Sequence, residues 1–337
     1  MEGSCMHFLK FLAGRLFTFV LVIFIGLTTV FIVPRLLPSD PVEAMIGQMM
    51  SMAHTMDPMA IESMRASLNA SFGLEGSLWE QYWVFMTRII VYRDFGPSLF
   101  GYPTPVMDIV GRALPWTFGL LMSSTLIAWV FGNAMGLIAG FRKNTKTSKV
   151  LEGIAIAFYP IPYYIFALAL IILFSFIFPI FPLTFTVVGS PLTLAFWQMV
   201  IRNSILPAAS IILTGLGWWM ISMKTVASAT AEEDYVTFAR LKGIPERKIM
   251  TGIVLRNSAL PQTTMLALQI GTIFGGAMIT EVLFGFPGMG SLMHRSILNA
   301  DYNLIMGTIS FSIIAVAITT LVIDLLYPFI DPRIRYK

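Results

Sequence analysis

Methionines gathered around His54 are the first residues in the sequence whose types could do chemistry. Thioether and imidazole ligands suit Cu(I), but methionine also fills irregular apolar gaps in short helices. Pro58 interrupts any continuous helical stripe of these side chains, so we favour a packing role over copper binding and predict no metal site. The set comprises Met45, Met49, Met50, Met52, Met56, Met59 and Met64.

Catalytic signatures are absent from the sequence. It contains no G-x-x-x-x-G-K-[ST], no H-E-x-x-H, no C-x-x-C and no G-x-S-x-G motif, which would respectively hold phosphate, zinc, a redox centre or a nucleophile. The three histidines, His7, His54 and His294, are far apart in the chain. We therefore expect a protein that is not an enzyme, binds no cofactor of its own and cannot hydrolyse ATP.

Two carboxylates stand at or near the ends of long apolar segments, where ionisable groups are costly and often functional. Glu281 precedes "VLFGFPGMG", in which the glycines and proline indicate irregular backbone. We name Glu281, Phe286, Pro287 and Gly288 as candidate pathway or gate residues, with a structural hydrogen bond as the alternative role for Glu281. Asp324 is expected to reach the membrane interface or a neighbouring arginine.

These residues belong to a chain with the composition of a membrane protein. Charged residues make up 12% and apolar residues 56% of the sequence, whereas soluble domains are about one quarter charged. A transmembrane helix needs about 20 apolar residues. The sequence therefore predicts an all-α polytopic membrane protein with six transmembrane helices, at residues 16–33, 113–141, 153–178, 203–223, 257–280 and 302–323.

The distribution of basic residues predicts the orientation of these helices, because cytoplasmic connections carry an excess of lysine and arginine. Basic residues crowd residues 142–149, 240–248 and 333–337, so these segments and the N-terminus are placed in the cytoplasm. Residues 179–191 are uncharged and rich in proline, and are placed outside. Both ends of the chain are therefore expected on the cytoplasmic side of the cell (inner) membrane.

The chain divides into four predicted regions: an N-terminal segment with the first transmembrane helix (1–33), an extracytoplasmic helical subdomain (34–112), a transmembrane core (113–330) and a cytoplasmic tail (331–337). Within the subdomain, "PSDPVEAMIGQMM" and "MDPMAIESMRASLN" each predict a short helix with Asp at the N-cap and Pro in the first turn. In the core, Pro160 and Pro162 should kink or break the third span.

The most highly charged stretch is residues 229–250, "ATAEEDYVTFARLKGIPERKIM", which has eight charges between Glu232 and Lys248. Inserting eight charges into a membrane would cost on the order of 20 kcal/mol, so the stretch is a cytoplasmic loop. Residues 234–242 predict a short helix with Tyr235, Phe238 and Leu241 on one face. Gly243 then ends this helix, and Pro245 begins a second.

An apolar stripe rimmed by charge is better explained as an anchor for another protein than as a solvated connection. At this loop the sequence resembles the membrane subunit of ABC importers, specifically the dipeptide and oligopeptide permease type. The motifs that carry the resemblance occur in family order over essentially the whole chain: "LPSDPVEAMIG", "FGPS", "EEDYVTFARLKGIPERKIMTGIVLRNSALP", "GGAMITEVLFGFPGMGSLM" and "DLLYPFIDPRIR". Three features depart from the family pattern. Thr237-Phe238-Ala239 stands where ABC importers in general have Glu-Ala-Ala, Phe286 stands where the peptide type usually has Trp, and the outer segment is unusually rich in methionine.

The resemblance implies how such a chain is assembled and powered. Two homologous permease subunits, usually different, form the pathway; two cytoplasmic ATPases, which bind ATP and Mg, dock on their coupling loops; and an extracytoplasmic solute-binding protein delivers the solute. Lipid surrounds the assembly, and no nucleic acid takes part. The coupling residues implied for this chain are Asp234, Tyr235, Phe238, Ala239, Arg240, Lys242 and Gly243.

The resemblance implies that the chain forms half of a translocation pathway for peptides. The same family type carries oligosaccharides or nickel complexes as alternatives. A secondary transporter driven by an ion gradient would place ionisable residues inside its spans, whereas most span centres here are uncharged. An assembly scaffold is a third hypothesis, and solute-stimulated ATP hydrolysis would distinguish a transporter from it.

Overall fold

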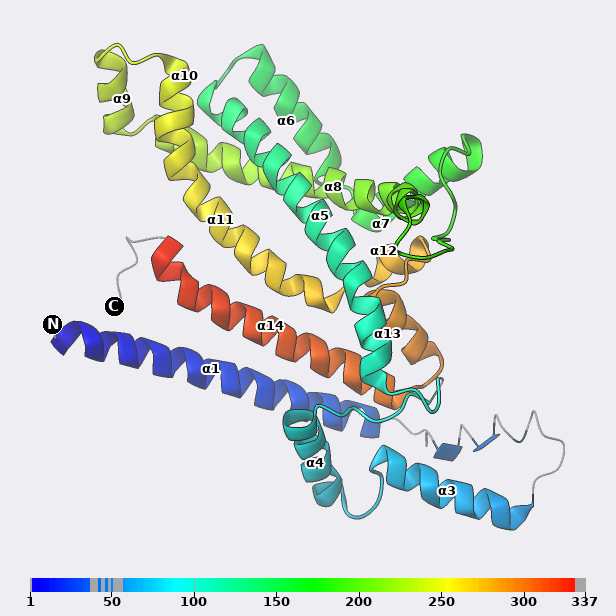
Figure 1. Cartoon of the computed structure of the whole chain (residues 1–337). Helices are drawn as coiled ribbons and strands as arrows, with labels where there is room; N and C mark the ends of the chain where they lie inside the picture. Colours follow the sequence, from blue (N-terminus) through cyan, green and yellow to red (C-terminus); the bar gives the residue numbers. More distant parts are fainter. Residues whose placement is uncertain are drawn as a thin grey trace. The chain divides into compact units, whose positions relative to one another are not determined.

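The described part of the chain is helical (Figure 1). The computed structural model describes residues 2–36, 42–43, 46–47, 50, 57–99 and 101–330. The helices are α1 (Glu2–Arg35), α3 (Pro58–Phe72), α4 (Leu78–Thr87), η1 (Arg88–Tyr92), α5 (Val106–Phe141), α6 (Lys146–Phe158), α7 (Tyr163–Ile171), η2 (Ile172–Ile177), α8 (Leu194–Ala231), α9 (Asp234–Leu241), α10 (Glu246–Lys248), η3 (Ile249–Val254), α11 (Leu255–Thr272), η4 (Ile273–Gly275), α12 (Met278–Leu283), α13 (Met289–Leu298) and α14 (Tyr302–Ile330).

Four helical segments in the described residues are long and apolar enough to cross a membrane: Lys10–Arg35, Val106–Phe141, Leu194–Ala231 and Tyr302–Leu326. Counting a bent pair of helices as one span raises the number to five. The remaining segment predicted to span, 257–280, is divided among α11, η4 and α12, and α11 carries the polar residues Asn257, Gln262 and Gln269. An all-α polytopic membrane protein is confirmed, whereas the sixth span and the orientation stay predictions.

The third predicted span is broken where its prolines fall. Lys146–Phe158 and Tyr163–Ile177 meet at an angle of 89°, with Pro160 and Pro162 in the four residues between them. A proline inside a helix removes a backbone donor and clashes with the preceding turn. The predicted kink is therefore confirmed as a sharp bend.

The structure separates into two compact units, of which the first contains residues 1–117, 274–278 and 287–321. In this unit, Asp57 caps α3 by accepting a hydrogen bond from the Met59 N–H at 3.1 Å, as predicted. The other predicted helix, 38–50, lies largely outside the described residues. Met64 packs against the cluster of Val42, Ile46, Leu68 and Phe72, which fits a packing role for that methionine.

The second unit contains residues 118–273, 279–286 and 322–337. Its core includes a close approach of α5 to α8, made possible by Gly132, Gly136 and Gly140 at four-residue spacing. A Cβ added at Gly136 would lie 2.5 Å from the carbonyl oxygen of Met220. Small residues spaced in this way let helix backbones pack closely in membranes, and we did not predict this contact from the sequence.

Candidate functional site

The charged loop folds into the two short helices that its sequence predicts. Asp234 stands in the first turn of α9, where a carboxylate interacts favourably with the helix dipole. At the other end, Gly243 has a φ of 73°, and its N–H donates to the Arg240 carbonyl at 2.9 Å while the Ile244 N–H donates to the Ala239 carbonyl at 3.2 Å. This pair of bonds is a Schellman cap, which favours glycine at the left-handed position.

One face of α9 is fixed to the body of the second unit. Val236 is 0% exposed and Ala239 is 4% exposed. Both side chains belong to an apolar cluster drawn from α5, α8 and η3: Leu137, Met223, Ala227, Ala231, Ile249 and Val254. A force on α9 is therefore transmitted to the ends of these helices through a packed contact.

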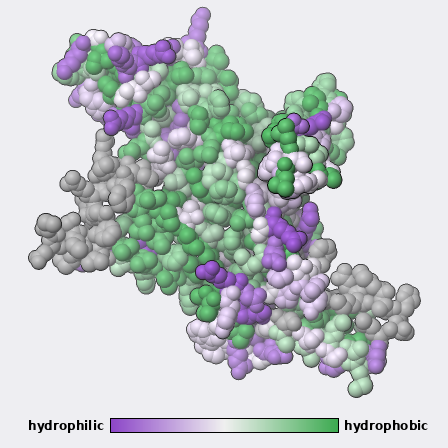
Figure 2. Space-filling model, viewed as in Figure 1, coloured by the Kyte–Doolittle hydropathy of each residue, from purple (hydrophilic) through white to green (hydrophobic). Residues whose placement is uncertain are grey.

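The opposite face of α9 carries the predicted apolar stripe. Tyr235, Phe238 and Leu241 are 45%, 58% and 81% exposed, and the Lys242 ammonium lies 4.5 Å from the centroid of the Phe238 ring. Figure 2 shows hydrophilic side chains gathered over α9 and α10, whereas apolar surface dominates over the long helices. The stripe is thus an exposed apolar surface that is surrounded by the charged side chains of the loop.

Arg240 differs from the other predicted coupling residues because its side chain turns back toward this subunit. Its Nε donates to Glu246 Oε1 at 3.0 Å across the Gly243 turn, and a terminal nitrogen donates to the Ala231 carbonyl at 3.4 Å. Its guanidinium carbon lies 5.6 Å from the centroid of the Phe141 ring. Arg240 therefore ties α9 to α5, α8 and α10. Sequence reasoning missed these contacts because the direction of the side chain depends on how the loop folds back on the neighbouring helix ends.

Two further ion pairs near this site were also not predicted. Lys143, after α5, pairs with Glu232 at the start of the loop, and Lys224 of α8 pairs with Glu152 of α6. The second pair lines a groove of about 700 Å³ between α6 and α8. The first pair joins the end of α5 to the start of the loop that carries α9, and the second joins α6 to α8.

The candidate pathway residues lie around a turn of irregular backbone, as predicted. Glu281 is fully buried in α12, its carbonyl accepts the Phe286 N–H at 2.7 Å, and Gly285 between them has a φ of 60°. The Phe286 ring packs edge-on against Phe185 with centroids 4.7 Å apart. This turn therefore lies against the segment that connects η2 to α8.

The last two candidates, Pro287 and Gly288, belong to the first unit. Gly288 caps α13 in extended backbone, and the next N–H, that of Met289, donates to Thr117 Oγ1 at 2.7 Å. Nothing in these contacts assigns a role in the pathway, so the roles of Glu281, Phe286, Pro287 and Gly288 stay predictions.

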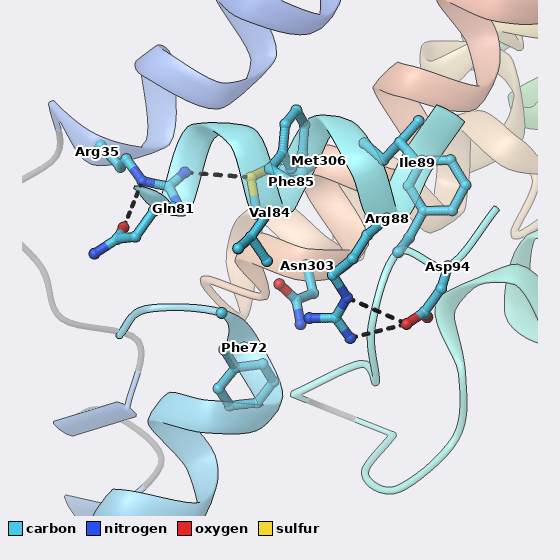
Figure 3. A pocket seen from close by; sticks show the side chains of 12 residues that line it. Arg35, Phe72, Gln81, Val84, Phe85, Arg88, Ile89, Asp94, Asn303 and Met306 are labelled. Carbon is cyan, nitrogen blue, oxygen red and sulfur yellow. Dashed lines mark hydrogen bonds and ion pairs between the residues drawn. The ribbon is translucent and has the colours of Figure 1, made fainter. Parts of the chain in front are cut away.

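A small pocket in the first unit contains polar side chains that were not predicted as site residues (Figure 3). Arg35 donates to Gln81 Oε1 at 3.2 Å, and to Met306 Sδ at 3.9 Å. Arg88 pairs with Asp94 at 2.8 Å. Burial raises the pKa of Asp94, but hydrogen bonds from Gly96 and Arg88 outweigh this effect and lower its pKa overall. Arg35 and Arg88 therefore line this pocket, and each is held in place by a polar partner.

Metal ligation finds no support among the residues that the structure describes, in which no group of three or more His, Cys, Asp or Glu side chains gathers. Met59, on α3, is 81% exposed. His54 and four of the seven methionines, Met45, Met49, Met52 and Met56, lie outside the described residues. Copper binding at the methionine-rich segment therefore remains untested.

Comparison with known proteins defines the class of this protein. Residues 132–336 match the family described as binding-protein-dependent transport system inner membrane component. Residues 8–120 match the N-terminal region of the membrane component of the same systems. The chain belongs to this family and is a multi-pass protein of the inner membrane.

Individual relatives are similar along almost their whole length. The glutathione transport system permease proteins GsiC of Shigella boydii serotype 4 and Escherichia coli K12 are each 30% identical to the chain over 329 residues, covering 98% of the chain and 100% of the relative. The dipeptide transport system permease protein DppB of Bacillus subtilis is 29% identical, covering 97% of the chain and 98% of the relative. The chain is therefore a permease subunit of a binding-protein-dependent transporter.

Proposed function

We propose that this permease subunit forms half of the translocation pathway of an ATP-driven importer for peptides, with α9 as its coupling helix. The observation that carries the coupling role is the division of α9 into two faces. Val236 and Ala239 anchor it to three other elements, while Tyr235, Phe238 and Leu241 remain exposed. A coupling helix needs an exposed face that binds the partner and a buried face that transmits the partner's movement to the rest of the subunit.

The names of the relatives support peptides as the solute, because glutathione and dipeptides share a peptide backbone and a carboxylate. Oligosaccharides and nickel complexes are the alternatives within the same family type. The proposed assembly contains a second, homologous permease subunit, two ATPases bound at the coupling loops and an external solute-binding protein. In this arrangement both chain ends and the α9 loop face the cytoplasm.

ATP drives transport in this proposal through closure of the ATPase pair. Closure moves α9, and the apolar cluster around Val236 and Ile249 carries the movement to α5, α8 and α11 as a largely rigid-body displacement. This displacement closes the translocation pathway toward the cytoplasm and opens it toward the outside. The ATP and Mg are bound by the partner subunits, and this chain contributes no catalytic group.

The proposal is tested with the assembled complex in proteoliposomes. Uptake of a radiolabelled dipeptide should require both ATP and the binding protein, and ATP hydrolysis should rise when the loaded binding protein is added. Uptake driven by a proton gradient without any ATPase would overturn the proposal in favour of a secondary transporter. A rate of ATP hydrolysis that does not change when the loaded binding protein is added would favour an assembly scaffold.

A further inference from the structure

The helix α4 and its continuation η1 expose an unusually apolar and aromatic surface. We define the α4 face as six side chains, whose exposed fractions run from 50% for Trp83 to 72% for Tyr92. Exposed apolar patches of this kind mark sites of protein or membrane contact. The members of the α4 face are Leu78, Trp79, Trp83, Ile90, Val91 and Tyr92.

The opposite side of α4 packs against the end of α1 (Figure 1). Tyr82, Met86 and Ile89 form one buried cluster with Leu27 and Phe31 of α1. The Tyr82 hydroxyl is 2.9 Å from Thr28 Oγ1, and the rings of Tyr82 and Phe31 meet edge-on with centroids 5.2 Å apart. The position of α4 along α1 is therefore fixed by specific contacts.

This position sets the depth of α4 in the membrane. The candidate span Lys10–Arg35 has 26 residues, which at 1.5 Å per residue is roughly 39 Å of helix against about 30 Å of hydrocarbon. Thr28 is seven residues before Arg35 and thus about 10 Å from that end of the helix. If the span is centred in the bilayer, Thr28 and its partner Tyr82 lie about 6 Å inside the hydrocarbon boundary, beneath the headgroups.

We propose that α4 and η1 form an interfacial helix, with the α4 face in contact with the lipids of the leaflet that contains the Arg35 end of α1. The surface is neither a free aqueous surface nor a protein-docking site. Three observations select lipid. The first is the depth shared with the transmembrane helix. The second is the pair of exposed tryptophans Trp79 and Trp83, whose ring centroids are 5.6 Å apart, with exposed Tyr92 at the other end of the segment. The third is the exposed aliphatic side chains between these ends. Tryptophan and tyrosine are enriched where hydrocarbon meets headgroups.

The polar groups of this helix lie where the proposal requires them. Glu80, in the first turn, accepts hydrogen bonds from the Ser77 N–H and hydroxyl at 2.7 and 2.9 Å, which holds its carboxylate at the helix N-terminus. At the other end, Arg93 is exposed just after η1, where a guanidinium can meet lipid phosphate. Between these ends, residues 81–92 contain three polar side chains besides the tyrosines. Gln81 donates to the Leu74 and Gly76 carbonyls, Arg88 pairs with Asp94, and Thr87 is exposed.

The proposal is tested by spin labelling of the assembled transporter in nanodiscs of phosphatidylethanolamine and phosphatidylglycerol. Cys5 is the single cysteine of the chain, so Cys5→Ser provides the background for Trp83→Cys and Ile90→Cys. Collisions of each label with oxygen, which concentrates in hydrocarbon, are compared with collisions with a water-soluble nickel chelate. Ala66→Cys, at an exposed position of α3, is the matched control.

The labels at residues 83 and 90 should show an oxygen-to-nickel collision ratio several-fold above that of residue 66. A ratio equal to that of residue 66 would place the α4 face in water and overturn the proposal. Protection from both reagents would also overturn it, by showing that another protein covers the surface. The two label sites are independent, so a Trp83→Cys protein that fails to assemble leaves the Ile90→Cys measurement decisive.

Discussion

Replacement of Phe238 by alanine tests the coupling role of α9 directly, because this ring is the largest exposed apolar group in the middle of the stripe. A phenylalanine offers about 200 Å² of apolar surface, of which 58% is exposed here. Burying the exposed part, about 115 Å², against an ATPase is worth roughly 3 kcal/mol. The Phe238→Ala subunit should therefore bind the ATPase on the order of 100-fold more weakly.

The matched control is Val236→Ala, on the same helix and two residues away. Val236 is 0% exposed, so loss of its methyl groups should reduce the free energy of unfolding by about 1 to 3 kcal/mol. Phe238→Ala should leave the melting temperature close to that of the wild type. The two substitutions thus separate an effect on docking from an effect on stability.

Two measurements decide between these outcomes: the affinity of the purified permease complex for the ATPase by titration, and its melting temperature in detergent. Phe238→Ala should weaken binding without lowering the melting temperature, and Val236→Ala should do the reverse. Wild-type ATPase affinity in the Phe238→Ala protein would refute the stripe as a docking surface. A melting temperature lowered as much as by Val236→Ala would show that the ring stabilises this subunit instead.

Three other substitutions have definite expected outcomes. Gly136→Ala should lower the melting temperature because its Cβ would meet the backbone of α8 at 2.5 Å, whereas Gly119→Ala, with nothing within 4 Å on the same helix, should not; equal melting temperatures would refute the close approach. Arg240→Met should preserve ATPase binding but uncouple hydrolysis from uptake, and Glu246→Gln, which weakens one of the three Arg240 contacts, should do so partly; wild-type coupling in both would remove the positioning role. Glu281→Gln should reduce uptake without loss of ATPase binding, and wild-type uptake would return Glu281 to a structural role.

Local signals in the sequence were sufficient to predict the helices of the charged loop, residues 229–250. Residues 234–242 predicted a helix, Gly243 its end and Pro245 a new beginning, and α9 and α10 follow that order. Capping, left-handed glycine and helical periodicity act over a few residues, so they can be read without the rest of the chain. The same reasoning located the Asp57 cap of α3 and the break at Pro160 and Pro162.

The span count was less predictable than the local elements. The segment 257–280 has an apolar average, but in the structure it is interrupted by η4 and contains several polar side chains in α11. Hydropathy measures the mean polarity of a window and does not reveal whether one continuous helix fills it. The composition thus identified a polytopic membrane protein without fixing each of its spans.

By itself, the sequence determined the membrane class, the family and the apolar stripe of α9, because these depend on composition, order and short spacings. Only the tertiary structure decided that Arg240 faces inward to Glu246 and Ala231 and that Gly136 meets Met220. It also decided that α4 packs Tyr82 against α1 while Trp79 and Trp83 remain exposed. The physical reason is that a side chain's contacts in a folded chain depend on how other elements pack around it, and on which face of its helix they cover.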